Sequence, residues 1–340
     1  MVSVYSVTHF FIDFACAFLM FCFIAGTTEG YLCVLLYNFC AFAMQMPIGI
    51  IADKLNRNYL FAICGCILVA VSYGLITFPI VAVIVIGIGN AMFHIGGGID
   101  VLNISEKKLS ALGIFVSPGA FGIYFGAMLG RDGLLPMIFL PLALVVAATL
   151  IFIVFKTQRG SYPENAEFSL HNAGLKAAFS AALCFFLVVC LRSYMGLAMN
   201  FSWTNIGLWG FVLICAVVFG KTLGGVFADK FGVVKTVFIS LGTASLLFLF
   251  PRFPIAGIVA ILLFNMTMPI TLWAMAKIFP GAKGFAFGLL TFALFLGFLP
   301  VYLDFDILGG APWLFALLSF VSLAILVTGL LRQPMRITNE

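Results

Sequence analysis

The sequence predicts an all-α membrane protein in which twelve transmembrane helices form two pseudo-symmetric halves of six. Of the 340 residues, 64% are hydrophobic and only 9% are charged, and the mean hydropathy is +1.22. Soluble domains contain about 25% charged residues, so a soluble enzyme, a nucleic-acid-binding protein and a disordered protein are excluded. The apolar runs are long and continuous, as spanning helices of about 20 residues require, and lack the alternation of β-barrel strands.

Charged residues, glycines and prolines separate the apolar runs in chain order. The first run has no basic residue before it and no small-residue cleavage site after it, which predicts a retained span rather than a signal peptide. The expected spans of the first half are 3–25, 31–52, 59–77, 79–102, 109–130 and 134–155. Those of the second half are 176–199, 205–228, 234–250, 254–277, 284–303 and 312–331. The longest polar stretch, 157–174, is the expected cytoplasmic linker between an N-terminal half, 1–156, and a C-terminal half, 175–340.

The basic residues are concentrated in every second loop, as the positive-inside rule expects of the cytoplasmic loops. On the opposite side only Arg131 and Arg252 are expected. The basic side holds Lys54, Arg57, Lys107, Lys108, Lys156, Arg159, Lys176, Lys230, Lys235, Lys277, Lys283, Arg332 and Arg336. This asymmetry predicts that both termini are cytoplasmic, and we expect a multi-pass protein of the bacterial inner membrane.

The composition also limits the partners. All nine cysteines lie inside apolar runs, without the loop spacing of a disulfide framework or a zinc site, so we expect no metal. A GxxxxGK[ST] phosphate loop is absent from the sequence, which predicts that transport uses an ion or solute gradient and no cofactor. The expected partners are a small-molecule solute, protons and the lipid bilayer, and the expected assembly is a monomer.

Two segments repeat at an offset of 176 residues (229 minus 53). QMPIGIIADKLNRN, which begins at Gln45, matches KTLGGVFADKFGVV, which begins at Lys221. The match sets Gly49 on Gly225 and Asp53 on Asp229, each at the cytoplasmic end of the second helix of its half. Parallel repeats of this kind build many secondary transporters, with the solute site at the midplane between the halves.

These two segments resemble the loop signature of the major facilitator superfamily. The resemblance implies the fold of that superfamily and a gate at the cytoplasmic side, formed by glycine-permitted packing and an aspartate with basic neighbours. The implied gating residues are Gly49, Asp53, Arg57, Gly225, Asp229 and Lys230. The second signature departs from the pattern because Val233 and Val234 replace its later basic pair.

Within the superfamily the chain resembles the fosmidomycin-resistance group of transporters. The segments that carry this resemblance are HFFIDF from His9, GNAMFHIGGG from Gly89, LRSYMGL from Leu191 and FPGAKGFAFGLL from Phe279. Glycines in the fifth span also resemble an antiporter motif, although Ala127 stands where that motif has proline. The resemblance implies efflux by antiport.

Ionisable residues inside spans are the strongest site candidates, because a charge at the centre of a helix costs about 2.5–3.5 kcal/mol on insertion scales. Asp13 lies near mid-membrane and is either a proton-coupling carboxylate or a structural ion-pair partner. His9 shares its helix face and either tunes that proton or lies at the headgroup boundary. His94, before three glycines, is either a solute or proton contact or a packed hydrogen-bonded histidine.

Two cations also fall within spans. Arg192 is suited to bidentate binding of an anionic solute, or it forms an ion pair with Asp13 across the halves. We expect Lys221 to snorkel toward the cytoplasmic interface rather than to line the cavity. Neutral polar residues in the spans either line the solute cavity or bond across helices; these are Asn38, Gln45, Tyr124, Tyr194, Asn200, Asn265, Thr267 and Trp273.

Together these observations predict a secondary transporter that moves a small polar or anionic organic solute or drug by alternating access, with proton-coupled efflux as the leading direction. The alternative is a proton-coupled uptake symporter for a nutrient such as an organic acid or an amino-acid-like solute. A membrane-embedded enzyme is disfavoured, because no His, Asp and Ser positions form a catalytic constellation by spacing. A channel is disfavoured by the two gate signatures.

Overall fold

A computed structural model describes residues 1–106, 108–133, 135–158, 162–170, 175–305 and 311–333. Throughout these residues the regular structure is helical. Ten helical stretches are long and apolar enough to cross a membrane, and the two shorter apolar helices Asn58–Ser72 and Val233–Leu247 complete the set. The prediction of an all-α protein with twelve spans is therefore confirmed. Lys107, Arg159 and Arg336 of the charge pattern lie outside the described residues.

The helices of the first half follow the predicted runs closely. They are α1 (Val2–Leu19) with the π-helix η1 (Met20–Ile24), α2 (Gly30–Asn38) with the π-helix η2 (Phe39–Ala43), α3 (Gln45–Leu55), α4 (Asn58–Ser72), α5 (Pro79–Ile104), α6 (Ser110–Val116), α7 (Pro118–Asp132) and α8 (Phe139–Thr157).

The second half follows the same plan. Its helices are α9 (Leu175–Ala198), α10 (Trp209–Phe231), α11 (Val233–Leu247), α12 (Pro254–Asn265), α13 (Thr267–Ile278), α14 (Lys283–Tyr302) and α15 (Pro312–Arg332). The tenth span is broken at Met266, and the fifth is broken at Ser117. At the latter break Pro118 follows at once, and its ring cannot donate the hydrogen bond that would continue the helix.

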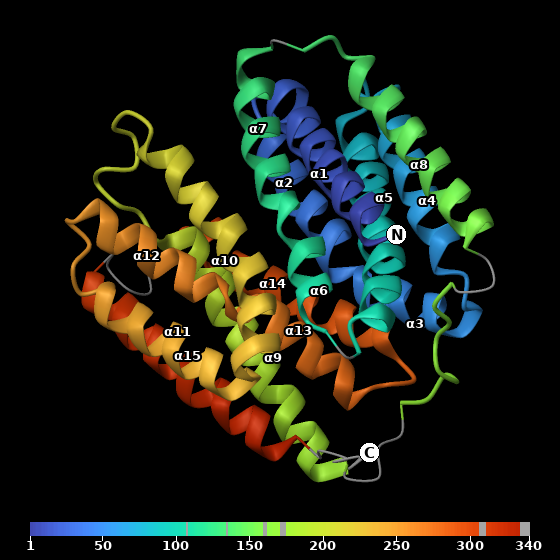
Figure 1. Ribbon diagram of the computed structural model, residues 1–340. Coiled ribbons are helices and arrows are strands. Elements are labelled where there is room, and N and C mark those ends of the chain that lie inside the picture. The colour runs from blue at the N-terminus through green and yellow to red at the C-terminus, as the bar shows by residue number, and fades with distance from the viewer. Residues whose placement is uncertain (107, 134, 159–161, 171–174, 306–310, 334–340) are drawn as a thin grey trace.

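The two groups of helices lie beside each other in Figure 1, with α1 to α8 in blue to green and α9 to α15 in yellow-green to red. They meet mainly where α3 packs along α14 and where α6 packs along α10. Both contacts lie toward the end of the bundle that holds Asp53 and Asp229, which we call the motif end. The end that holds Tyr31 and Tyr302 is called the opposite end.

Close packing of α1 on α7 positions the central site. A side chain at Gly130 would meet Phe18 O at 2.9 Å, and side chains at Gly122 and Gly126 would press against the backbone oxygens of Phe10 and Phe14. Small residues at such positions let helix backbones approach closely in membranes. The glycines of the fifth span therefore bring the polar face of α1 directly against α7.

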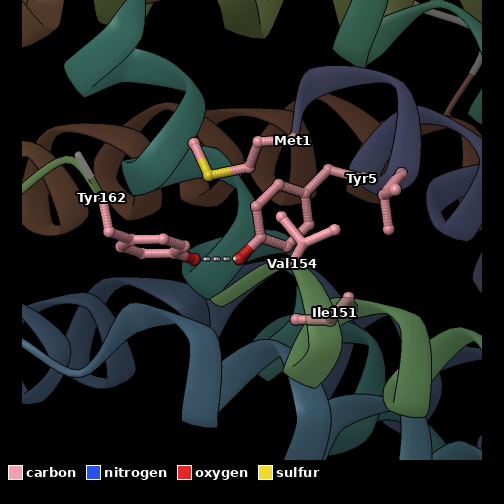
Figure 2. Close-up of a pocket in the computed structure, with 6 residues that line it drawn as sticks. Met1, Tyr5, Ile151, Val154 and Tyr162 are labelled. Atoms are coloured by element: carbon pink, nitrogen blue, oxygen red, sulfur yellow. Dashed lines mark hydrogen bonds between the residues drawn. The ribbon is translucent and has the colours of Figure 1, made fainter. Parts of the chain in front are cut away.

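The linker segment 162–170 contacts both halves: Tyr162 and Asn165 bond to the first half, and Ser169 N donates to Gly281 O of the second half at 3.1 Å. Tyr5 donates a hydrogen bond to Asp100 Oδ2 at 2.7 Å, Tyr162 donates to the same oxygen, and the two hydroxyls lie 2.7 Å apart (Figure 2). Asn58 donates to Asp100 Oδ1 at 2.8 Å and to the side chain of Asn165 at 2.8 Å. Burial and the adjacent Asp100 carboxylate raise the pKa of Tyr162, so its hydroxyl remains a donor at neutral pH.

Candidate functional site

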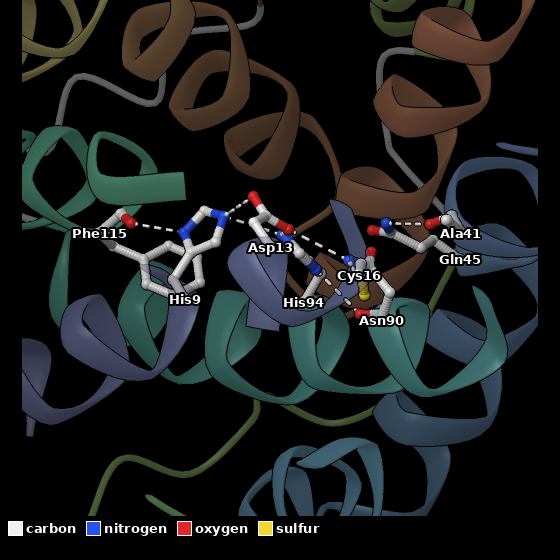
Figure 3. Close-up of polar contacts among 8 residues, drawn as sticks. All are labelled: His9, Asp13, Cys16, Ala41, Gln45, Asn90, His94 and Phe115. Atoms are coloured by element: carbon white, nitrogen blue, oxygen red, sulfur yellow. Dashed lines mark hydrogen bonds and ion pairs between the residues drawn. The ribbon is translucent and has the colours of Figure 1, made fainter. Parts of the chain in front are cut away.

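Three ionisable side chains converge inside the first half of the bundle (Figure 3). Asp13 Oδ2 lies 3.2 Å from His9 Nε2, and Asp13 Oδ1 lies 3.8 Å from His94 Nε2. The two Nε2 atoms lie 2.9 Å apart. Asp13 and His9 are buried, and His94 is partly buried. We call Asp13, His9 and His94 the central triad.

Backbone and amide groups orient the central triad. His9 Nδ1 lies 2.7 Å from Phe115 O, and His94 Nδ1 lies 2.9 Å from Asn90 O. The buried Asn90 side chain donates to Asp13 Oδ1 at 3.1 Å. Each ring is thus held at Nδ1 by a carbonyl oxygen, and its Nε2 atom faces the other members of the triad.

Helical periodicity explains how the sequence builds this site. His9 and Asp13 lie one turn apart on α1, and Asn90 and His94 lie one turn apart on α5, so each pair projects from one face of its helix. The helix α7 closes the site at Gly119, where a side chain would press against Asp13 Oδ2 and His9 Nε2. The predicted pairing of His9 with Asp13 is present in the structure, and His94 joins it.

The triad is also the one group of potential metal-donor atoms among the described residues, with all donor atoms within 4.8 Å. Two nitrogens bound to one tetrahedral Zn²⁺ ion lie about 3.3 Å apart, given Zn–N bonds of about 2.0–2.1 Å. The observed Nε2–Nε2 distance of 2.9 Å is instead that of an N–H···N hydrogen bond.

The two cationic side chains within the spans, Arg192 and Lys221, both belong to the second half. Arg192 on α9 donates from Nη1 to Thr271 Oγ1 on α13 at 3.1 Å. Among the described residues Arg192 forms no ion pair with Asp13, which pairs with the histidines instead. Arg192 is partly exposed.

Lys221 on α10 lies within electrostatic range of Asp13, Arg192 and His94. The expectation that it snorkels to the cytoplasmic interface is therefore wrong. Its backbone passes close to Gly113 of α6, where a side chain would meet Lys221 O at 2.8 Å. The position thus faces the junction of the two halves, eight residues and about 12 Å of helix from Asp229.

The neutral candidates are more dispersed. Asn38 and Asn265 donate to the carbonyl oxygens four residues earlier in their own helices, at 2.8 and 2.9 Å, and Tyr194 is buried on α9. Tyr124 lines a cavity of about 320 Å³ at the opposite end, together with Thr204, Asn205, Leu208 and Phe211. Asn38, Asn265 and Tyr194 do not line this cavity.

Two further candidates, Trp273 and Gln45, are among the described residues that have a buried polar atom without a hydrogen-bond partner. The indole N–H of Trp273 is buried without a hydrogen bond, with Lys277 Nζ 5.6 Å from the ring centroid. Gln45 Oε1 is likewise unpaired, although its amide donates to Ala41 O at 2.6 Å (Figure 3).

The two repeated aspartates make equivalent contacts across the halves. Asp53 at the end of α3 accepts hydrogen bonds from the backbone N–H groups of Gly284 and Phe285, at 2.8 and 2.9 Å, in the first turn of α14. Asp229 at the end of α10 accepts from Leu109 and Ser110, at 2.7 and 2.9 Å, at the start of α6. A carboxylate at a helix N-terminus satisfies free N–H groups and complements the helix dipole.

The glycines of the repeat allow these contacts. A side chain at Gly49 would collide with the backbone of Gly284, and one at Gly225 would meet Leu109 O at 2.6 Å. Arg57 is exposed and forms no ion pair with Asp53 among the described residues. Lys230 is exposed, with its Nζ 5.2 Å from the centroid of Phe231. Both basic residues thus lie near the aspartates in sequence but take no part in the hydrogen bonds that the aspartates accept.

Several residues at these sites escaped the sequence analysis. The buried Lys283 at the start of α14 forms an ion pair with Glu106 at 2.6 Å and donates to Asn103 at 2.8 Å, which adds a third link across the halves. Asn90 carried a usable signal, because it is a polar residue one turn before His94 in an apolar helix. Gly119 carried none, because its importance depends on which helix faces it.

Substitution of Gly119 by alanine is expected to displace the central triad. The added methyl group would overlap Asp13 and His9, and overpacking of this kind costs about 1–3 kcal/mol. We expect a lower unfolding temperature and loss of pH-driven solute movement in proteoliposomes. Gly242→Ala is the matched control, because its nearest neighbour would be Leu323 Cδ2 at 3.9 Å. Unchanged behaviour of Gly119→Ala would mean that α7 does not confine the triad.

Comparison with known proteins finds similar solved structures but no match at the level of sequence. No protein-family model matches the sequence, and no curated protein matches it at the sequence level. Among solved structures it is similar to the major facilitator superfamily transporter FucP in the outward conformation, with a TM-score of 0.71 and 14% identity over 98% of this chain and 99% of that one. A single-substitution variant of the E. coli fucose:proton symporter FucP gives a TM-score of 0.72, with 15% identity over 98% and 99%.

The human organic anion transporter MFSD10 (TETRAN) is similar with a TM-score of 0.65 and 15% identity, over 95% of this chain and 99% of that one. All three matches span nearly the whole of both chains. The chain is therefore a multi-pass membrane protein with the fold of the major facilitator superfamily transporters.

Proposed function

We propose that the protein is a secondary transporter that moves a small anionic organic solute by alternating access and couples this movement to protons. The observation that carries the proposal is the pair of equivalent contacts by which Asp53 and Asp229 cap helices of the opposite half. Such contacts hold one end of a two-half bundle shut and can be broken when the halves rock. Charged groups from both halves lie in the interior above this closed end.

The basic residues concentrate at the motif end, which supports a cytoplasmic position for that end and for both termini. Three links, through Asp53, Asp229 and Lys283, close it. The opposite end has one contact between the halves as well, because Tyr31 and Tyr302 are stacked and each hydroxyl donates to the backbone oxygen of the other, at 3.2 and 2.8 Å. The larger number of links at the motif end supports an outward-facing conformation, in line with the outward conformation described for the similar FucP structure. The setting proposed for the protein is the bacterial inner membrane, where it works as a monomer.

Arg192 and Lys221 indicate the charge of the solute. Both cations face the interior, and neither forms an ion pair with an acidic side chain in the described part of the chain. A charge inside a membrane protein is stabilised by a partner or by water, so two such cations favour an anionic solute. Asp13 does not neutralise them directly because the histidines surround its carboxylate.

Two directions of transport have separate support. The resemblance of HFFIDF and GNAMFHIGGG to the fosmidomycin-resistance group favours proton-coupled efflux by antiport. The similarity to a structure described as a fucose:proton symporter supports the alternative of proton-coupled uptake. Altered drug susceptibility of expressing cells would favour efflux, and growth rescue on a single nutrient would favour uptake.

Arg192→Lys is the test of anion recognition. The substitution keeps the positive charge but loses the planar fork that binds a carboxylate or phosphoryl group through two hydrogen bonds. We expect the solute affinity to fall about tenfold or more, which corresponds to about 1.4 kcal/mol. The measurement is thermal stabilisation of the purified protein by a panel of anionic metabolites and antibiotics, followed by uptake into proteoliposomes.

The matched control is Arg252→Lys, at an exposed position of the opposite end. Normal transport and affinity in Arg192→Lys would rule out bidentate recognition by Arg192. If no anion stabilises even the wild-type protein, whereas neutral or cationic solutes do, the proposed solute class is wrong.

A further inference from the structure

The donor and acceptor roles within the central triad can be worked out atom by atom. His9 Nδ1 lies 2.7 Å from the carbonyl oxygen of Phe115, and His94 Nδ1 lies 2.9 Å from that of Asn90. A carbonyl oxygen only accepts hydrogen bonds, so both Nδ1 atoms carry a proton. A neutral imidazole has a single N–H, and therefore both Nε2 atoms carry a lone pair if both rings are neutral.

Those two Nε2 atoms face each other at 2.9 Å. Two lone pairs at this distance repel, whereas one proton between them gives an N–H···N hydrogen bond of ordinary length. The rings are nearly perpendicular, at 88°, which allows an N–H of one ring to point at the lone pair of the other. The contact therefore requires one additional proton.

A proton on Asp13 does not remove this conflict. A carboxylic acid donating from Oδ2 would satisfy His9 Nε2 across 3.2 Å, but the lone pair of His94 would still face that of His9. Asp13 Oδ1 already accepts from Asn90 at 3.1 Å, and this bond favours the charged form of the carboxyl group. One proton between the rings and one negative charge on Asp13 leave the triad neutral.

The surroundings limit the pair to one proton. The other titratable or charged groups that act on the triad are Cys16 on α1, Tyr37 on α2 and Lys221 on α10. From α6 and α7 the triad meets the carbonyl oxygen and ring of Phe115, Gly119 and Gly122, none of which carries a titratable group. The Lys221 cation disfavours a second positive charge on the rings. His94 is the more exposed of the two rings, with 13% of its side chain accessible against 7% for His9, so we expect the proton to enter and leave through His94.

We propose that the protein stores its transported proton between His9 Nε2 and His94 Nε2, as a hydrogen-bonded imidazole and imidazolium, while Asp13 remains an ionised counter-ion. The statement that this proton is transported rests on the proposed function, whereas the presence of a proton shared by the two rings does not. It moves His94 from the solute site to the proton site. Asp13 becomes a positioning and charge-balancing residue for the proton.

The chain is well suited to a direct test because it contains only three histidines. The experiment is solid-state ¹⁵N and ¹³C NMR of the full chain in lipid bilayers, labelled on histidine and aspartate, over a range of pH. His171→Asn removes the third histidine, which lies outside the described residues, and serves as the background for all spectra. We expect a through-hydrogen-bond coupling between the two Nε2 atoms, one charged and one neutral ring, and an ionised Asp13 carboxylate at the same pH.

Two variants separate the roles of the residues. In Asp13→Asn, the ratio of charged to neutral imidazole at a given pH is expected to fall about tenfold or more, because an adjacent opposite charge is lost. In His94→Asn the coupling between the two Nε2 atoms disappears, whereas His9 keeps the proton on Nδ1 that the carbonyl oxygen of Phe115 accepts. Two neutral rings beside a protonated Asp13 in the parent protein would overturn the inference, and so would Nε2–H on both rings.

The outcome is independent of the outcome for transport. A shared proton in a protein that shows no pH-driven solute movement would overturn the proposed coupling and leave the shared proton in place. A protonated Asp13 in a protein that does couple to protons would overturn the shared proton and leave the proposed function in place.

Discussion

Asp13→Asn is expected to abolish pH-driven transport while solute exchange is retained. The substitution preserves the shape of the side chain and its contact with Asn90, but it removes the negative charge that lies 3.2 Å from His9 and 3.8 Å from His94. Without this charge the imidazole pair has no counter-ion in a membrane interior that already contains Arg192 and Lys221. The proposed coupling proton is then lost, whereas Arg192 on α9 and Thr271 on α13, at the proposed solute site, are unchanged.

The measurement compares two assays in proteoliposomes: solute movement driven by a pH gradient, and exchange of labelled against unlabelled solute without a gradient. Asp132→Asn is the matched control, because the same substitution there affects an exposed residue at the end of α7. Transport that still responds to a pH gradient in Asp13→Asn would remove Asp13 from the coupling mechanism. Loss of exchange as well would indicate a structural role.

Asp53→Asn is expected to impair turnover strongly while the solute affinity stays within a few-fold of wild type. Asp53 is buried and accepts two backbone hydrogen bonds from the first turn of α14. An asparagine has one acceptor oxygen and no charge, so at least one charge-assisted hydrogen bond is lost, at about 1.5–3 kcal/mol. The closed motif end should then open more readily, by a factor of about 10–100 in its equilibrium constant.

Asp229→Asn should act in the same direction with a smaller effect, since Asp229 is exposed and its hydrogen bonds compete with water. Opening is measured as the distance between spin labels at Leu55 and Lys277, two exposed positions of the motif end. Glu29→Gln, an exposed acidic position at the opposite end, is the control. Unchanged turnover and unchanged label distances in Asp53→Asn would exclude Asp53 from the gate.

Much of the architecture was accessible from the sequence, because hydrophobic length and charge asymmetry are properties of local segments. All twelve predicted spans are present, including the short α4 and α11. The repeat of Asp53 at Asp229 correctly indicated equivalent positions in the two halves, since each lies at the end of a helix that touches the other half. The pairing of His9 with Asp13 followed from helical periodicity on a single helix.

The partners of these residues were not accessible from the sequence. The basic neighbours Arg57 and Lys230 suggested a charge cluster, but the aspartates cap backbone N–H groups, which every residue except proline possesses and no sequence pattern marks. Lys221 was placed at the interface by its distance from the helix end, whereas the packing of α10 on α6 turns it toward the interior.

The sequence by itself determined that the chain spans a membrane twelve times in two related halves, and which ionisable residues lie within the spans. Only the tertiary structure decided that His94 from α5 joins His9 and Asp13 from α1, and that Gly119 leaves room for them. It also decided that Arg192 bonds to Thr271 instead of Asp13. The reason is physical. Hydropathy and periodicity act along one helix, whereas the direction of a hydrogen bond between helices depends on their rotation and separation, which packing over the whole bundle sets.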